Sequence, residues 1–298
     1  MRFMRDNLTR RDFLRTAALI PSFAAMSGVL AGCAGAASNA KAWSGPPGSR
    51  RLSRIGLQLY TERELMQRDA PDTLAAIAKA GYTEVELAGL YGHTAREMRS
   101  YLDAVSLASP AGHVSLEDLR ESFPRLVDDA HVLGWKWVIL PWLDPKHRTL
   151  DGYRSLAAEF NRFGESAKGA GLRFAYHNQE YDGHPFFPSG RIPYELLLEE
   201  TRVDLVDFEM DLFWMVKGGG DPIQFMTLHP GRFPLLHVKD MTTAGQMANV
   251  GAGSIDFRAI FADAAAAGTT HFFVEHDAPV NPIADITASI DYLKRIRF

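Results

Sequence analysis

The chain has 298 residues, enough for one barrel-sized domain or for two small ones. Its composition, 46% hydrophobic and 23% charged, is that of an ordinary globular protein, and its formal net charge is −4. A chain with this charge lacks the basic footprint of a nucleic-acid-binding domain, so we expect no nucleic-acid partner.

The first 33 residues resemble a bacterial export signal. Residues 9–14 (TRRDFL) form a twin-arginine pattern, and the apolar stretch that follows, residues 16–32, is interrupted by Pro21. This stretch is too short and too weakly apolar for a stable membrane span. Residues 30–33 (LAGC) resemble a lipobox that ends in Cys33, the only cysteine of the chain. We expect export by the twin-arginine route to the periplasm and lipidation of Cys33, with simple cleavage or an unprocessed leader as alternatives.

A change of composition separates this signal from the rest of the chain. Residues 34–51 are rich in Ala, Ser, Gly and Pro and are expected to form a flexible tether. Strand-like and helix-like patterns then alternate from residue 52 to residue 298. The predicted strands are Ile55–Tyr60, Thr83–Leu87, Ala111–Val114, Trp137–Pro141, Arg173–His177, Val206–Asp211, Leu235–Lys239 and Phe272–Glu275. The predicted helices are Ala70–Ala80, Thr94–Val105, Ser115–Leu133, Tyr153–Ala170, Pro193–Thr201, Ile223–Leu228, Phe257–Ala267 and Ile283–Ile296.

The regular alternation of these elements predicts a single (β/α)8 TIM barrel, an α/β fold, over residues 52–298. Thr94 followed by Glu97 is a capping-box pattern and supports the helix that it opens. A doubly wound sheet is the alternative, and it would be expected to carry a Gly-rich phosphate loop after an early strand. The only such run, at residues 218–220, lies late and lacks the required spacing.

Four metal-type side chains end the apolar runs of the last four predicted strands: His177, Asp211, His237 and Glu275. The carboxyl ends of barrel strands meet at one rim, so residues this far apart in sequence are expected to come together. Two imidazoles and two carboxylates suit a divalent ion. We therefore predict one bound divalent metal, which could be Mn, Zn, Co, Fe or Mg.

Other polar residues near strand ends extend the predicted site. His113 ends the third strand, either as a hydrogen-bonded rim histidine or as a substrate contact. Asp207, Glu209 and Asp211 share one strand face, where carboxylates are costly unless they are paired or metal-bound. Lys239 shares a face with His237, and we expect it to neutralise Glu209.

Eight segments resemble the xylose isomerase-like barrel superfamily, and within it the sugar phosphate isomerase/epimerase group. They are GLQLYTER, GYTEVELAGLYGHTAREMRSYLD, HVSLE, FAYHNQE, FEMDLFWMVKGGGDP, LLHVKDM, VGAGSIDF and FVEHD. The resemblance runs from Arg54 to Phe298 and implies a single divalent metal at the mouth of the barrel.

In the better-known sugar epimerases of this superfamily the ligands are Glu, Asp, His and Glu. By resemblance the last three correspond to Asp211, His237 and Glu275, whereas the first corresponds to His177. The two glutamates of those epimerases also act as an acid/base pair. Because His177 stands in place of one of these glutamates, either Glu180 supplies the missing carboxylate or a single acid/base group acts on one face of the substrate.

These observations predict a metal-dependent isomerase or epimerase that acts on a sugar or keto-sugar through an enediolate. Glu275 is the expected base, and His113, Glu180 or Lys239 would move protons or stabilise oxyanions. Trp214 and Tyr60 are candidate platforms for a sugar ring, although a core role for Trp214 is equally compatible with the sequence. Glu86, on the second strand, is a further candidate substrate contact.

Three alternatives stay open. An enediolate could instead expel a leaving group, which would make the protein a lyase or hydrolase of 3-keto-glycosides. The chain could also be a lipid-anchored sugar-binding protein with a degenerate site. The endonuclease branch of the superfamily would need several metals, more histidines and a basic groove. For every function except the endonuclease, the expected partner is a small carbohydrate. Contact with the membrane is expected only through the lipidated N-terminus. The sequence does not indicate an oligomeric state.

Overall fold

The computed structural model describes residues 48–186 and 188–298. The predicted export signal, Cys33 and most of the predicted tether, up to residue 47, lie outside the described residues. Arg50, at the end of that tether, exchanges two backbone hydrogen bonds with Phe298, at 3.1 and 3.2 Å. Within the described part of the chain, no helix is both long enough and apolar enough to span a bilayer.

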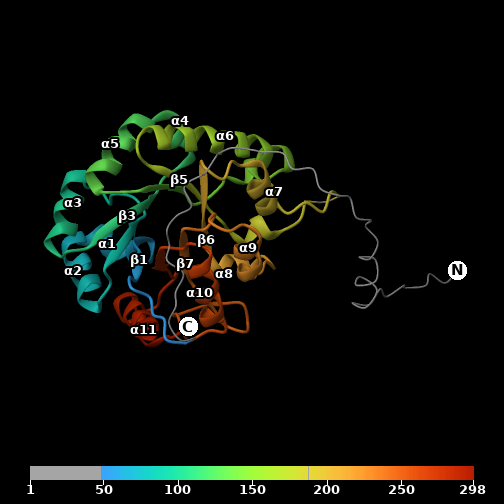
Figure 1. The fold of residues 1–298 in the computed structure, drawn as a ribbon. Coiled ribbons are helices and arrows are strands. Elements are labelled where there is room, and N and C mark those ends of the chain that lie inside the picture. Colours follow the sequence, from blue (N-terminus) through green and yellow to red (C-terminus); the bar gives the residue numbers. More distant parts are fainter. Residues whose placement is uncertain (1–47, 187) are drawn as a thin grey trace, which may run out of the picture. The chain divides into compact units, whose positions relative to one another are not determined.

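Eight parallel strands close into a barrel in the order β1-β10-β7-β6-β5-β4-β3-β2 (Figure 1). The predicted single (β/α)8 barrel is therefore confirmed, and each predicted strand overlaps one that is present. The strands are β1 (Gly56–Gln58), β2 (Glu84–Leu87), β3 (Ala108–His113), β4 (Trp137–Leu140), β5 (Arg173–His177), β6 (Val206–Asp211), β7 (Leu235–Val238) and β10 (His271–Val274).

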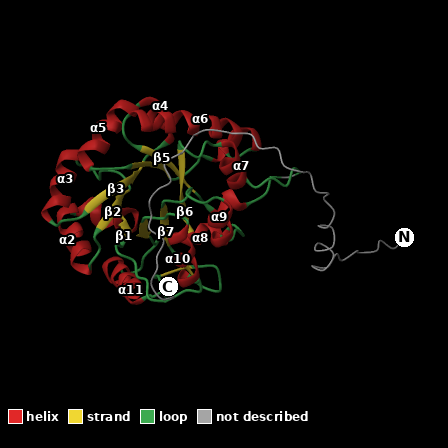
Figure 2. Cartoon of the chain, viewed as in Figure 1, coloured by secondary structure: helices red, strands yellow, loops and turns green. Residues whose placement is uncertain are grey.

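Helices surround these strands on the outside of the barrel (Figure 2). They are α1 (Arg63–Arg68), α2 (Ala70–Ala80), α3 (Ala95–Ala104), α4 (Leu116–Glu121), α5 (Phe123–Leu133), α6 (Leu150–Gly169), α7 (Pro193–Glu200), α8 (Leu212–Lys217), α9 (Pro222–Leu228), α10 (Phe257–Ala266) and α11 (Pro282–Arg295). Short 3-10 turns are η2 (Leu59–Glu62), η3 (Pro145–His147) and η4 (Glu180–Gly183), and β8 (Asp240–Met241) pairs with β9 (Met247–Ala248) in a small hairpin.

The predicted continuous helix Ser115–Leu133 is wrong, because α4 ends at Glu121 and α5 begins at Phe123, with Ser122 as the cap between them. Pro124 has no N–H and its ring would clash with the carbonyl four residues earlier, so it is tolerated only in the first turn of a new helix. The predicted capping box is present: Thr94 N donates to Glu97 Oε2 at 2.8 Å, and Glu97 N donates to Thr94 Oγ1 at 3.2 Å.

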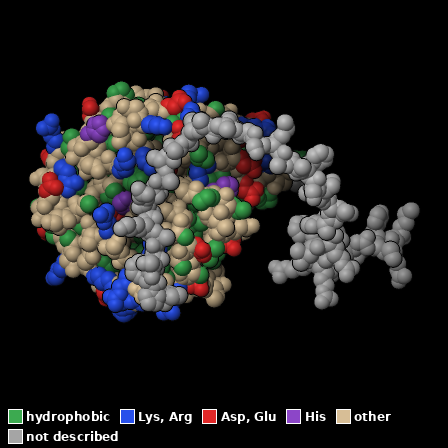
Figure 3. Space-filling model, in the orientation of Figure 1, with side chains coloured by type: hydrophobic (Ala, Val, Ile, Leu, Met, Phe, Trp, Pro, Cys, Tyr) green, Lys and Arg blue, Asp and Glu red, His purple; other side chains and the backbone are tan. Residues whose placement is uncertain are grey.

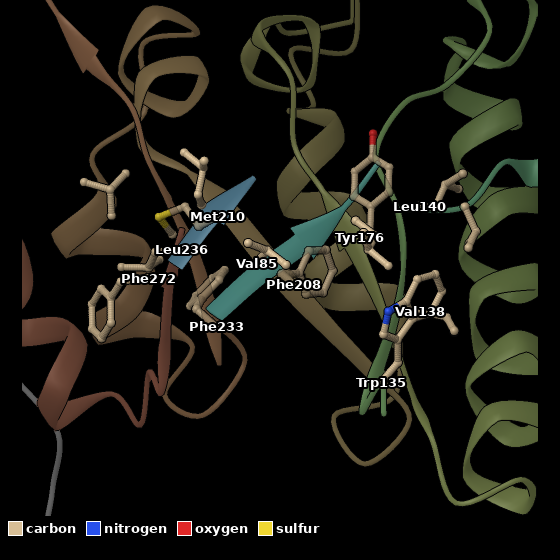
Figure 4. Packing of buried hydrophobic residues seen from close by; sticks show 14 of the residues in the cluster. Val85, Trp135, Val138, Leu140, Tyr176, Phe208, Met210, Phe233, Leu236 and Phe272 are labelled. Carbon is tan, nitrogen blue, oxygen red and sulfur yellow. The ribbon is translucent and has the colours of Figure 1, made fainter. Parts of the chain in front are cut away.

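Alternation along the strands separates two apolar layers. Outward-facing residues such as Val138, Phe208 and Leu236 pack under the helices in the main core (Figure 4). A smaller inner cluster, Ala111, Trp137, Ile139, Ala175, Leu235 and Phe273, fills the barrel. On β5, β7 and β10 the inward face that carries this cluster is followed by polar residues at the carboxyl side, and the inward face of β6 is acidic throughout, which places the site over an apolar floor.

Candidate metal centre and cavity

The structure brings together the four residues that end the late strands. His177, Asp211, His237 and Glu275 are all buried, and their ligand atoms lie within 4.8 Å of one another. His177 Nε2 lies 3.2 Å from His237 Nδ1, which lies 2.9 Å from Glu275 Oε2. We call these four residues the quartet.

Backbone register and one amide side chain hold the quartet in place. Asp211 on β6 is the direct partner of His237 on β7. Asn178, just after β5, donates to the carbonyl of Asp211 at 3.2 Å and accepts from its N–H at 2.9 Å. The Asp211 side chain also accepts from Trp214 N at 2.8 Å and so caps α8, which fixes its carboxylate at the end of the strand.

Lys239 is a buried cation beside the quartet. Its Nζ lies 3.0 Å from Asp211 Oδ2, 2.6 Å from Glu275 Oε2 and 2.8 Å from Asp277 Oδ1. The expected pairing of Lys239 with Glu209 is therefore wrong, since Lys239 lies beyond the end of β7 and Glu209 lies two residues before the end of β6. Burial alone would lower the pKa of Lys239, but Asp211 and the two other carboxylates raise it well above its usual range.

A second group of ligand-type side chains lies against the first, and it shares His237. Its members are Glu86, His113, Glu209 and His237, again with ligand atoms within 4.8 Å. His113 Nε2 lies 3.0 Å from both Glu86 Oε2 and Glu209 Oε2, and His237 Nε2 lies 2.8 Å from Glu86 Oε2. Glu86 also accepts from Gln58 Nε2 at 2.6 Å.

The strand pattern identified Glu209 as an inward-facing acid, but it did not identify Glu209 as a member of a site. The available signal was the spacing of Asp207, Glu209 and Asp211, which puts three carboxylates on one face. Their partners on the other side of the barrel are not visible in that spacing.

Opposite charges pack closely in both groups and shift the pKa values of their side chains. Burial alone would lower the pKa of His113, but Glu86 and Glu209 raise it to about 9. Burial alone would raise the pKa of Glu275, but Lys239 and His237 hold it well below its usual range. Charged groups this deep are favourable only when they are paired in this way or bind a cation.

The quartet is chemically suited to a divalent ion. Two imidazole nitrogens and two carboxylates converge from four strands, a donor set compatible with several first-row metals. His177 Nδ1, on the far side of the ring, is buried and has no hydrogen-bond partner among the described residues. A ligating histidine usually donates from its second nitrogen, so His177 lacks the usual support for its orientation.

A cavity of about 1270 Å³ opens next to the quartet. His177, Glu275, Lys239 and Asp277 line it, and so do His113, Tyr60, Trp142 and Trp214. Tyr60 and Trp142 are 43% and 50% exposed, and Lys239 Nζ lies 5.4 Å from the centre of the Trp214 ring. The volume exceeds the roughly 300–1,000 Å³ of most small-molecule pockets.

Two predicted site residues lie elsewhere. Glu180 does not line this cavity, and it lies in ion-pair range of Lys217 at 3.6 Å and His184 at 3.9 Å. Glu86 is fully buried in the second group and is also absent from the cavity lining. Trp142 and Asp277 also line the cavity, although neither was selected as a site residue from the sequence.

Acidic and basic side chains are interspersed over the face of the molecule shown in Figure 3. This distribution agrees with the balanced composition of the chain.

Comparison with known proteins supports the fold assignment. The family described as "Xylose isomerase-like TIM barrel" matches residues 55–296. The crystal structure of a sugar phosphate isomerase/epimerase from Parabacteroides distasonis ATCC 8503 is 27% identical, with a TM-score of 0.70 over 87% of this chain and 98% of that one.

Two further similarities are more distant. An inosose dehydratase from Lacticaseibacillus casei is 22% identical over 183 residues, which are 54% of this chain and only 60% of the relative. The structure of the IOLI protein with a binding zinc atom is 17% identical, with a TM-score of 0.62 over 80% of this chain and 95% of that one. At these identities the structural likeness concerns the fold.

Proposed function

The chain belongs to the xylose isomerase-like TIM barrel family, and on that premise we propose that it is a divalent-metal-dependent isomerase or epimerase of a sugar or keto-sugar. The observation that carries the proposal is the quartet, which lies beside a large cavity with a buried ammonium at its edge. The names of two similar proteins, a sugar phosphate isomerase/epimerase and an inosose dehydratase, support a sugar-modifying activity.

His177, Asp211, His237 and Glu275 would hold the ion. When bound, a divalent cation supplies Lewis-acid polarisation of a substrate carbonyl, which acidifies the neighbouring C–H. The IOLI structure, which has the same fold, is described with a binding zinc atom, and this agrees with a metal-dependent enzyme.

The chain's own groups would then move the proton. Glu275 lines the cavity, and Lys239 and His237 hold its pKa well below the usual range, so its carboxylate is placed to take a proton from the carbon next to the carbonyl. Lys239 lies 2.6 Å from that carboxylate and would donate a hydrogen bond to oxygen as negative charge develops. The product of this step is an enediolate.

Asp277 could supply the second carboxyl group of an acid/base pair, which a histidine at position 177 does not provide. It lines the same cavity, 2.8 Å from Lys239 Nζ, and burial together with the charge of Glu275 raises its pKa. A carboxyl group with a raised pKa is suited to return a proton. We therefore assign this role to Asp277 rather than to Glu180, which is ion-paired outside the cavity.

The fate of the enediolate distinguishes the possible activities. Protonation of the neighbouring carbon gives isomerisation, and protonation of the same carbon on its other face gives epimerisation. Loss of a leaving group from the next carbon would cleave a 3-keto-glycoside. The cavity volume of about 1270 Å³ favours the last activity as a second candidate, because there is room for an aglycone beside the reacting sugar.

Exchange of substrate hydrogen with D2O tests the proposal. The purified protein, loaded with Mn²⁺, Zn²⁺ or Co²⁺, is incubated with ketoses and 3-keto-glycosides, and deuterium uptake and released aglycone are measured by NMR. Exchange or elimination is the expected result. Bound metal with neither reaction would indicate a sugar-binding protein with a degenerate site, and tight DNA binding at physiological salt would point to the endonuclease branch.

We further propose that the protein is exported and anchored by a lipid on Cys33, which favours an unphosphorylated substrate. Cell fractionation tests this location, since Cys33→Ala should move the protein from the membrane fraction to the soluble fraction. Equal membrane association of both forms would contradict lipidation.

A further inference from the structure

The second group of ligand-type residues has the composition of a metal site in its own right. Glu86, His113 and Glu209 come from β2, β3 and β6 and are buried or nearly so. His113 Nε2 lies 3.0 Å from an oxygen of each carboxylate, a hydrogen-bond distance that is also short enough for the three side chains to share one small cation. Imidazole with carboxylate is a donor set that suits Zn²⁺ and Co²⁺.

Unpartnered oxygen atoms give an independent reason to expect a cation here. Glu86 Oε1 and Glu209 Oε1 are both buried and have no hydrogen-bond partner among the described residues. A buried carboxylate oxygen without a partner is costly, and such atoms are usually explained by a bound ion or water. Both atoms belong to the two carboxylates of this group.

The balance of buried charge points in the same direction. Glu86, Glu209, Asp211 and Glu275 are four buried carboxylates in one connected network, and Lys239 is a buried ammonium that contacts it. If the quartet holds the divalent ion of the proposed function, that ion and one ammonium leave one negative charge, or two with Asp277, and either a protonated His113 or a second cation would balance it. Buried charges are normally paired or coordinate metals.

The two nitrogens of His237 divide between the two groups. Nδ1 lies 2.9 Å from Glu275 Oε2 in the quartet, whereas Nε2 lies 2.8 Å from Glu86 Oε2. A neutral imidazole has one lone pair and one N–H. With Nδ1 as a ligand in the quartet, Nε2–H would donate to Glu86, so the second site would have three protein ligands of its own.

We propose that Glu86, His113 and Glu209 form a second divalent-cation site inside the barrel, adjacent to the quartet and joined to it through His237. Three protein ligands leave an open position, as in many catalytic zinc sites. The site is separate from the proposed function, because the quartet could bind its ion without it.

Metal stoichiometry in matched variants tests the second site. The purified protein is depleted with a chelator and titrated with Zn²⁺ and, separately, with Co²⁺, and bound metal is counted by mass spectrometry after gel filtration. We expect two equivalents in the wild type, one in Glu209→Gln and one in Asp211→Asn. Glu84→Gln is the control, since this buried β2 carboxylate pairs with His271 at 3.0 Å outside both groups, and it should keep two.

Each outcome decides between the two sites. One equivalent in the wild type that is lost in Asp211→Asn and kept in Glu209→Gln would overturn the second site, and protonated imidazoles would then balance the charge. One equivalent that is lost only in Glu209→Gln would support the second site and contradict the proposed function. If Glu209→Gln does not fold, by circular dichroism, a metal-soaked wild-type crystal decides: an anomalous peak between Glu86 and Glu209 supports the site, and its absence overturns it.

Discussion

At the residue scale, Glu275 has two possible roles, as a ligand and as a base. It contacts His237 and Lys239 directly, and it also lines the cavity. Asp211, by contrast, belongs to the quartet and caps α8, but it is not among the residues that line the cavity. The two carboxylates should therefore respond differently to substitution.

We expect Asp211→Ala, like His237→Ala, to lose metal and activity together. Glu275→Gln keeps an oxygen that can still bind, so it should retain more metal than activity, with a rate reduced by about 10²–10⁴-fold. Metal content and turnover are measured on the same preparations, with Glu84→Gln as the control. An equal loss of both properties in Glu275→Gln would mean that this residue is a ligand and not the base.

Glu62 is a residue whose ionisation opposes folding. Both of its carboxylate oxygens are buried without a hydrogen-bond partner among the described residues. Burial, and then the charge of Asp285, raise the pKa of Glu62 from 4.5 to about 7. The folded state thus binds more protons than the unfolded state between these values, so stability falls as the pH rises through this window.

Glu62→Gln should remove this penalty. The variant is expected to gain up to about 3 kcal/mol over the wild type at pH 8 and little at pH 4, because the ionised form is present only at the higher pH. Urea unfolding of both proteins across this range measures the difference. A gain that does not depend on pH would contradict the assigned pKa.

At the element scale, the ends of β5 and β6 are held together by Asn178. Its amide spans the two strands and satisfies both backbone groups of Asp211, at 3.2 and 2.9 Å. This contact fixes the distance between two quartet ligands that lie on different strands, His177 and Asp211.

Asn178→Ala should therefore disturb the metal site without removing a ligand. We expect a loss of about 1–3 kcal/mol of stability, because a buried N–H and a buried carbonyl lose their partner. Metal affinity should fall as well, whereas Asn161→Ala, which removes amide contacts on the outer face between α6 and α7, should leave it unchanged. Thermal unfolding and metal titration are the two measurements, and unchanged affinity in Asn178→Ala would show that the strand ends hold their positions without the amide.

At the scale of the whole molecule, the cavity lies next to the buried polar side chains of the barrel interior, because His177, Lys239 and Glu275 line it. Trp142, half-exposed after β4, lies on the cavity wall, and its ring centre lies 5.2 Å from the Arg148 guanidinium. The placement suits contact with a part of the substrate that does not react.

Trp142→Ala should accordingly raise KM for a 3-keto-glycoside about fivefold, equivalent to about 1 kcal/mol of lost aromatic contact, with kcat little changed. A keto-monosaccharide, which lacks the aglycone, should show a smaller effect. Leu228→Ala on α9, which is exposed and does not line the cavity, serves as the control. A KM change of the same size for both substrates would place Trp142 against the reacting sugar instead.

The alternation of strand-like and helix-like runs was sufficient to predict the barrel. The spacing of apolar residues indicates whether a run is a strand or a helix, and eight strands that alternate with eight helices are typical of a parallel barrel. The quartet was predictable for the same reason, since strand ends meet at one rim whatever the details of packing. Pro124 also signalled the break between α4 and α5, although the prediction overlooked it.

Only the tertiary structure decided which inward side chains meet. The alternation of side chains along a strand indicates that Glu86, Glu209 and Lys239 face the interior. Contacts across the barrel, however, depend on the order and stagger of strands that are far apart in sequence. Closure pairs Lys239 with Asp211 and Glu275, brings Glu86 and Glu209 to His113, and leaves Glu180 outside the cavity. Sequence by itself therefore determined the fold and the residue types of the site, whereas the closed sheet determined how their charges are paired.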